Sequence, residues 1–166
     1  MSSPAPEAAN DTDDLAFLDE AVALAVNSVR NGGGPFGAVV VEDGQVVARG
    51  VNQVTQNLDP SAHAEVLAIR EACRARGDFQ LRGMTLYSSC EPCPMCLATS
   101  LWARVDRVLY AANRHDAAVG GFDDVAFYDL FATPREKWQT PVVEVRTQEP
   151  TAPFTAWLAS PSRTDY

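Results

Sequence analysis

The 166-residue sequence predicts one α/β domain in which helices are layered on a mostly parallel or mixed sheet. Two observations support this class. Runs rich in β-branched residues alternate with segments that have the spacing of amphipathic helices. Apolar residues make up 46% of the chain and charged residues 21%, an ordinary balance for a globular protein that buries a core. No internal repeat or linker interrupts the body of the chain.

The first half of the chain predicts helices on either side of a hairpin. Its expected elements are a helix over about 14–31, strands over 36–42 and 46–51, and a helix over about 61–76. Three glycines end the first helix, and Asp43-Gly44 is typical of a tight turn between strands. Asp59 followed by Pro60 is typical of a helix start, with a capping side chain and a first-turn proline.

The second half continues the alternation of strands and helices. Its expected elements are a strand over 85–88, a helix to about 103, a strand over 107–111, a short helix over 123–130, a strand over 141–145 and a helix over 152–159. The helix that ends at about residue 103 starts near Pro92, a residue tolerated at a first helical position. Asp123 and Asp124 read as a helix start.

The N-terminus and the overall charge limit the expected partners. Residues 1–13 predict a disordered acidic leader without the basic start and apolar run of a secretory signal. No stretch is long and apolar enough to span a membrane. The net charge of −9 argues against a broad nucleic-acid-binding surface. Four cysteines without a signal peptide indicate reduced thiols. We therefore expect a cytoplasmic protein with no membrane or nucleic-acid partner.

Two short motifs predict a zinc site with its own proton carrier. His63-Ala64-Glu65 is followed by Pro92-Cys93-Pro94-Met95-Cys96, and H-x-E with P-C-x-x-C is the signature of zinc-dependent nucleobase deaminases. His63, Cys93 and Cys96 would fill three positions of a zinc tetrahedron and leave the fourth for water. Two thiolates weaken the pull of the cation on that water, so a nearby base is needed, and Glu65 is the candidate.

Helix spacing supports the convergence of the two cysteines more strongly than that of His63 and Glu65. Cys93 and Cys96 lie three residues apart near a helix start, where they face the same way and the positive helix end favours thiolates. His63 and Glu65 are two residues apart and share no face of a regular helix. They would converge only at an irregular helix start.

The chain resembles the cytidine deaminase superfamily, and within it the bacterial guanine deaminases. The resemblance rests on the blocks GPFGAVVVEDG, DPSAHAEVLAIREAC, SSCEPCPMC, AANRHDAAVGGFDD and APFTAW with RTDY, and it covers nearly everything after about residue 14. It implies a three-layer α/β/α sandwich with a central mixed sheet and zinc-dependent hydrolysis of guanine to xanthine and ammonia. It also implies a homodimer in which the C-terminal segment 150–166 of one subunit closes the active site of the other.

The same resemblance assigns roles to particular residues. The ligands would be His63, Cys93 and Cys96, with Glu65 as the main proton shuttle. The further assignments are Asp116 as a second acidic shuttle, Phe36 stacking on the purine, Asn52 and the backbone of Ala64 bonding to it, and Tyr166 arriving from the partner subunit. The dipeptide Arg114-His115 departs from the expected pattern beside Asp116.

Each assignment has a plainer alternative. The zinc site could be structural, or the two cysteines a redox pair, and Cys90 could close the site as a fourth ligand instead of packing as a small buried residue. The alternatives for the remaining residues are a helix cap or loop acid for Asp116, a turn residue for Asn52, a core residue for Phe36 and a frayed terminus for Tyr166. His115 is expected to be a surface or hydrogen-bonded loop residue and not a ligand.

Three rival functions remain at this level. Related aminohydrolases of the same fold act on guanosine, cytosine or a triazine such as ammeline. A tRNA adenosine deaminase shares both short motifs, although the acidic composition argues against it. A non-catalytic zinc-binding module would keep the ligands and make no use of Glu65.

Overall fold

The computed structural model describes residues 11–165. The chain forms two compact units, one ending at Tyr128 and the other beginning at Asp129. The first unit contains every strand of the sheet, and the second consists of short helices and extended chain. Most of the expected leader, and Tyr166, lie outside the described residues, while residues 11–13 already belong to the first helix.

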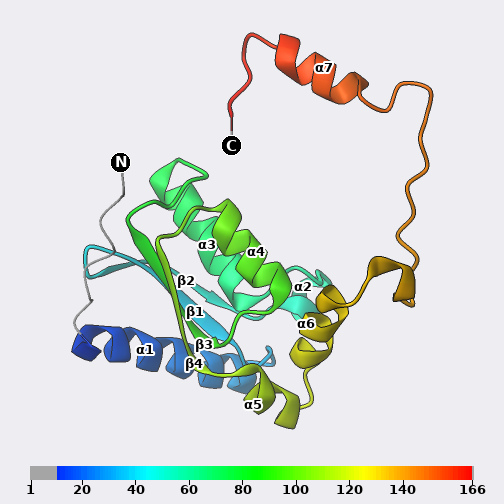
Figure 1. Ribbon diagram of the computed structural model, residues 1–166. Coiled ribbons are helices and arrows are strands. Elements are labelled where there is room, and N and C mark those ends of the chain that lie inside the picture. The colour runs from blue at the N-terminus through cyan, green and yellow to red at the C-terminus, as the bar shows by residue number, and fades with distance from the viewer. Residues whose placement is uncertain (1–10, 166) are drawn as a thin grey trace. The chain divides into compact units, whose positions relative to one another are not determined.

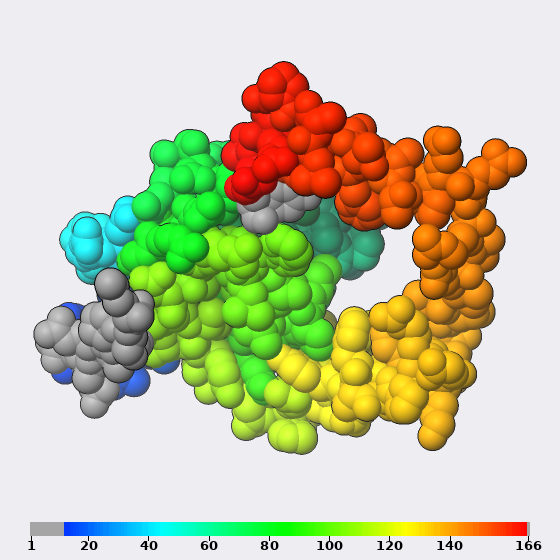
Figure 2. All heavy atoms as spheres, turned by 45° about the horizontal axis from the view of Figure 1, so that its top comes forward, coloured from blue at the N-terminus to red at the C-terminus, as the bar shows by residue number. Residues whose placement is uncertain are grey.

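The sheet of the first unit is mixed, as predicted. Its strands are β1 (Gly37–Glu42), β2 (Gln45–Val51), β3 (Met84–Cys90) and β4 (Arg107–Ala112), in the order β2-β1-β3-β4. β1 runs antiparallel to both β2 and β3, and β3 runs parallel to β4. Asp43 and Gly44 both have positive φ, 48° and 73°, so the hairpin has the predicted tight turn. That turn lies in the cyan part of the surface that protrudes in Figure 2.

Helices cover both faces of this sheet (Figure 1). α1 (Asp11–Arg30) lies on one face, and α3 (Ala64–Arg76) with α4 (Pro94–Trp102) lies on the other. Successive residues of β1 alternate between the layers, because side chains of a strand point to opposite faces. Val39 and Val41 join the cluster that includes Phe17 of α1, whereas Val40 joins the cluster that includes Ala68 of α3. The first unit therefore has the three layers implied by the resemblance.

The two helices on the second face of the sheet, α3 and α4, begin later than the sequence predicted. Asp59 does not cap α3, because its carboxylate accepts hydrogen bonds from the backbone N and the Oγ of Ser61, at 2.8 and 2.7 Å, and closes a local turn. His63 is the N-cap of α3 instead. Cys93 is the N-cap of α4, so Pro94 and not Pro92 takes the first turn. A residue that precedes proline is pushed to extended backbone, which explains the ψ of 167° at Cys93.

The later elements match the sequence less evenly. α6 (Asp124–Ala132) and α7 (Ala152–Ala159) confirm the two expected helices, and α2 (Val54–Asn57) and α5 (Arg114–Val119) are additional. The strand expected over 141–145 is wrong for the described chain, because residues 141–147 (orange in Figure 2) pair with no strand there. A β-rich run becomes a strand only when another strand supplies hydrogen-bond partners.

None of the helices in residues 11–165 combines the length and the apolar character that crossing a membrane requires.

Candidate metal centre

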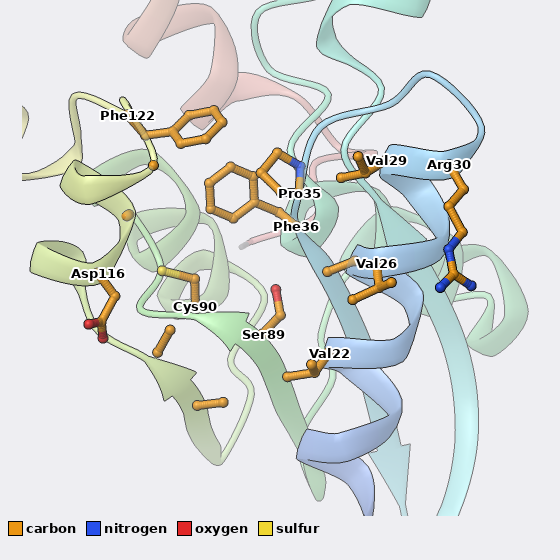
Figure 3. Close-up of a pocket in the computed structure, with 15 residues that line it drawn as sticks. Val22, Val26, Val29, Arg30, Pro35, Phe36, Ser89, Cys90, Asp116 and Phe122 are labelled. Atoms are coloured by element: carbon orange, nitrogen blue, oxygen red, sulfur yellow. The ribbon is translucent and has the colours of Figure 1, made fainter.

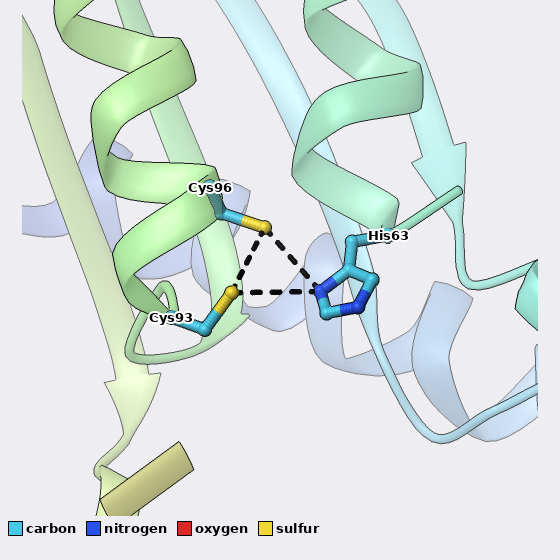
Figure 4. A group of neighbouring side chains, drawn as sticks. All are labelled: His63, Cys93 and Cys96. Carbon is cyan, nitrogen blue, oxygen red and sulfur yellow. Dashed lines mark hydrogen bonds between the residues drawn. The ribbon is translucent and has the colours of Figure 1, made fainter. Parts of the chain in front are cut away.

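The first residues of α3 and α4 bring three ligand atoms together (Figure 4). The Nδ1 atom of His63 lies 3.6 Å from the Sγ of Cys93 and 3.4 Å from the Sγ of Cys96. The two sulfur atoms lie 3.6 Å apart. Within residues 11–165 this is the one cluster of three or more His, Cys, Asp or Glu side chains arranged to hold a metal ion.

The size and chemistry of this triangle fit zinc. Zn–S bonds of about 2.3 Å and a Zn–N bond of about 2.0–2.1 Å give a tetrahedron with an S···S edge of about 3.8 Å and S···N edges of about 3.6 Å. The observed separations of 3.6, 3.6 and 3.4 Å are close to these edges. Cys90 is not part of the triangle, because its thiol is directed to the backbone oxygen of Asn113, 3.6 Å away. Three protein ligands leave one tetrahedral position for water.

The two thiols share a proton in a way that prepares them for a cation. The thiols of Cys93 and Cys96 are hydrogen-bonded to each other, and this contact, with a further one to His63, lowers the pKa of Cys93 to about 4 in spite of burial. The same contact and burial raise the pKa of Cys96. The pKa of His63 is raised, chiefly by its hydrogen bond to Cys93. A divalent cation would replace the shared proton, since metal ligands must be deprotonated.

Glu65 lies beside the ligands in a buried position. Its side chain is in the first turn of α3, only 4% exposed, and its Oε1 accepts a hydrogen bond from the Oγ of Ser88 at 3.3 Å. Burial raises the pKa of Glu65, and the nearby Cys93 acts in the same direction. His63 and Glu65 converge because His63 still has extended backbone and the helix starts after it. This is the irregular helix start that the spacing required.

Gly50 allows α3 to approach the sheet at this point. A Cβ atom built on Gly50 would lie 2.1 Å from the backbone oxygen of Ala64 and 2.6 Å from the backbone nitrogen of Ala68. Only glycine fits such a contact without displacing the helix. The start of α3, which carries His63 and Glu65, is therefore seated directly on strand β2.

A cavity of about 400 Å³ opens beside the ligands. This volume is within the range typical of small-molecule sites. Its lining includes the ligands His63 and Cys93, with Glu65, and also Gly32, Gly33, Gly34, Phe36, Asn52, Val54, Thr55, Glu91, Phe122 and Asp124. The structure thus brings the predicted residues Phe36 and Asn52 to the metal centre. Asn52 is buried, and its Oδ1 accepts a hydrogen bond from the Val54 N–H at 3.3 Å.

Asp116, the expected second acid, is not in this cavity. Its exposed carboxylate accepts a hydrogen bond from the Asn113 N–H at 2.8 Å, while the Asn113 side chain accepts from the N–H of Asp116. The pair forms a capping box at the start of α5, which is the plainer alternative for Asp116. Asp116 lines a separate apolar cavity of about 600 Å³, across from Val22 and Val26 of α1 (Figure 3).

A different acid, Asp124, lies in the cavity where Asp116 was expected. It lines the cavity of the ligands, and burial together with the nearby Cys93 raises the pKa of its carboxyl. The sequence reading of Asp123-Asp124 as a helix start was correct, but it gave no reason to place the second of these acids in the site. Local spacing carries no such signal, because the position depends on how α6 returns to the ligands.

The fold and the site together define a zinc-binding deaminase domain. Residues 11–112 match the family model of the cytidine and deoxycytidylate deaminase zinc-binding region, and the chain belongs to this family. It is 49% identical over 151 residues to the guanine deaminase of Bacillus subtilis, a match that covers 90% of this chain and 97% of the relative. An X-ray structure of guanine deaminase from Bacillus subtilis superposes with a TM-score of 0.88 at 48% identity, covering 92% of this chain and 98% of that chain. The suspected resemblance and the fold class are confirmed.

Other relatives match a smaller part of the chain. A tRNA-specific adenosine deaminase of Bacillus subtilis is 41% identical over 101 residues, which is 61% of this chain and 63% of that protein. A guanine deaminase from Nitrosomonas europaea superposes with a TM-score of 0.64 at 31% identity, covering 66% of this chain and 64% of that chain. A further structure, in complex with 2,6-diaminopurine, has a TM-score of 0.65 at 31% identity, covering 67% of this chain and 62% of that chain.

Proposed function

We propose that this protein is a zinc-dependent aminohydrolase that converts guanine to xanthine and ammonia. The observation that carries the proposal is the triangle of His63, Cys93 and Cys96 with the buried carboxylate of Glu65 beside it, in a cavity of about 400 Å³. The similarity to the Bacillus subtilis guanine deaminase over nearly the whole of both chains supports guanine as the substrate.

The cavity offers groups suited to a purine. Phe36 and Phe122 meet edge to face with ring centroids 4.7 Å apart, so they present an apolar surface for a flat heteroaromatic ring. The side chain of Asn52 has both a donor and an acceptor, which matches a purine edge that presents both. The N–H of Ala64 is at the first position of α3 and has no partner within the helix.

The chemistry assigns two carboxyl groups to proton transfer. A zinc ion in this site would supply a water molecule whose pKa is lowered towards neutrality. Glu65 would accept the proton of that water and deliver it to the ring nitrogen next to the reacting carbon. The departing amine leaves only when it is protonated. We propose Asp124 as the second acid for this step, in place of Asp116, because Asp124 lines the cavity and Asp116 caps α5.

We also propose that the protein acts as a homodimer in which segment 150–166 of one copy completes the cavity of the other, with Tyr166 as the last residue to arrive. β4 is an edge strand of the sheet, and the β-rich run 141–147 pairs with no strand among the described residues. α7 presents exposed apolar side chains, including Phe154 and Leu158. A second copy would give these groups partners, since unpaired edges and exposed apolar helices favour association.

Ammonia release from a panel of substrates tests the activity. Guanine is expected to turn over, with guanosine, cytosine and ammeline as competitors in parallel incubations. Turnover of guanosine with guanine inert would contradict the choice of substrate. A tRNA substrate is expected to be inert, because no lysine or arginine is among the residues that line the cavity, and phosphate binding depends on such groups.

Glu65→Gln separates catalysis from metal binding. The substitution keeps the size of the side chain and removes its ability to carry a proton. We expect bound zinc, measured by metal analysis, to stay at one ion per subunit while kcat falls by about 100-fold or more. Retained activity would refute the shuttle role, and activity that survives complete removal of zinc would refute the proposed chemistry.

A further inference from the structure

One arginine, Arg114, connects two segments of the chain that line the candidate active site. The guanidinium of Arg114 grips the carboxylate of Glu91 in a two-pronged ion pair, with Nε 3.0 Å from Oε2 and Nη2 in contact with Oε1. The backbone N–H of Arg114 donates to the same Oε2 at 3.0 Å. The same guanidinium lies over the ring of Tyr128, with Cζ 3.4 Å from its centroid. The hydroxyl of Tyr128 in turn donates to the backbone oxygen of Pro92 at 2.6 Å.

These contacts connect the segment that carries Asp124 to the segment that carries the metal ligand Cys93. Glu91 and Pro92 are the two residues directly before Cys93. Arg114 and Tyr128 lie on either side of the chain that contributes Phe122 and Asp124 to the cavity. Both ends of that chain are therefore anchored to one short loop. A shift of either anchor would move Asp124 relative to His63 and Cys93.

The contacts require arginine in particular. Its planar fork binds both oxygens of Glu91 while its face stacks on Tyr128, and lysine cannot make both contacts. The side chains of Arg114 and Glu91 are 30% and 12% exposed, so the pair is partly shielded from water and from salt.

We propose that Arg114, through Glu91 and Tyr128, is a positioning residue that holds Asp124 at the distance from the metal centre needed for proton delivery. The inference rests on the proposed function and extends it to a residue that is not among those lining the cavity. Misplacement of a reacting group by about 1 Å costs on the order of 100-fold in rate, so a contact outside the cavity can control turnover.

The test is a double-mutant cycle between Arg114→Met and Asp124→Asn. Arg114→Met keeps most of the length of the side chain and removes the fork. We expect it to lower kcat by about 10- to 100-fold with zinc content unchanged. In the Asp124→Asn background the same change is expected to lower kcat by less than about 2-fold, because the group to be positioned is already absent. Arg74→Met is the matched control, since the side chain of Arg74 pairs with Glu71 at the exposed surface, and it is expected to leave kcat unchanged.

The possible outcomes separate the positioning role from a general one. An unchanged kcat in Arg114→Met, an equal loss in both backgrounds, or a loss of zinc would each overturn the proposal. Arg114→Lys, which retains the charge but not the fork, is measured in the same cycle. If Arg114→Met does not fold, Arg114→Lys replaces it and is judged by the same three outcomes. If the unsubstituted protein releases no ammonia from guanine, this result counts against the proposed function and not against the positioning role. The cycle would then use whichever substrate of the panel releases ammonia.

Discussion

Asp14 is a buried charged residue that links α1 to the sheet. One oxygen of its carboxylate accepts a hydrogen bond from the Tyr87 hydroxyl, and the other accepts from Nη2 of Arg107 at 2.9 Å. Asp14 is 8% exposed. Burial opposes its ionisation, but the hydrogen bonds from Tyr87 and Arg107 outweigh burial and lower the pKa of Asp14. Burial, together with the same hydrogen bond, raises the pKa of Tyr87.

This pKa shift predicts a pH dependence of stability. The pKa of Asp14 in the folded protein is below its unfolded value of about 3.9, so the folded state gains stability at pH values above about 4 and loses it as the pH falls through the folded pKa. Asp14→Asn is expected to reduce the free energy of unfolding by about 1–3 kcal/mol at pH 7. The loss should shrink towards pH 2.

Urea unfolding across this pH range measures the effect. Asp13→Asn is the control, because Asp13 is exposed and its substitution should change stability by less than about 0.5 kcal/mol. A difference between Asp14→Asn and the unsubstituted protein that stays constant from pH 7 to pH 2 would contradict the assignment.

Single residues of the site were predictable to different degrees. His63, Cys93, Cys96 and Glu65 follow from short motifs, because the chemistry of the metal fixes residue type and spacing. The choice between Asp116 and Asp124 depends on the path of the chain after β4, which no local pattern encodes. Tyr166 lies outside the described residues, so its role stays a prediction.

The start of α3 shows how an element places catalytic groups. The helix contacts β2 at Gly50, where a side chain would meet the backbone of Ala64. Gly50→Ala is expected to push this helix start away from the sheet and to separate His63 from the two cysteines. We expect the free energy of unfolding to fall by about 1–3 kcal/mol and kcat to fall by at least about 10-fold.

Zinc affinity measured by competition with a chromophoric chelator reports the displacement directly. The affinity should fall in Gly50→Ala and stay unchanged in Arg49→Ala, the neighbouring exposed position on the same strand. Equal zinc affinity in the two variants would show that the close approach at Gly50 does not position His63.

Elements with strong local signals were predictable, and elements that depend on distant partners were not. α1, the β1–β2 hairpin and α7 follow from periodicity and turn residues. The starts of α3 and α4 were misplaced because Asp59 closes its own turn and because Pro94 forces Cys93 out of the helix. The run over 141–145 has the composition of a strand but finds no partner among the described residues.

At the scale of the whole molecule, the proposed exchange of the C-terminal segment predicts complementation between two inactive variants. One variant lacks residues 150–166 and keeps Glu65, and the other is full-length with Glu65→Gln. Each is expected to lose most of its activity while remaining folded. In a mixed dimer the truncated subunit would receive the intact segment of its partner, so one competent cavity would form.

Activity after co-refolding of equal amounts measures this effect. About half of a random mixture is mixed dimer, and each mixed dimer has one competent cavity, so recovery of about a quarter of the unsubstituted activity is expected. Co-refolding the truncated variant with a truncated Glu65→Gln variant is the control. No recovery in the first mixture, or full activity of the truncated protein alone, would contradict the exchange.

The ligands of the metal centre are widely separated along the chain, because Cys93 lies 30 positions after His63. A cation gripped by both would close the intervening chain into a loop and join α3 to α4 as a reversible cross-link. Because such an ion binds the folded chain in preference to the unfolded one, each tenfold rise of free zinc above its dissociation constant would add about 1.4 kcal/mol to the free energy of unfolding. Heat resistance would then follow the zinc supply of the surroundings, and metal starvation would expose the protein to unfolding and proteolysis as well as to loss of turnover.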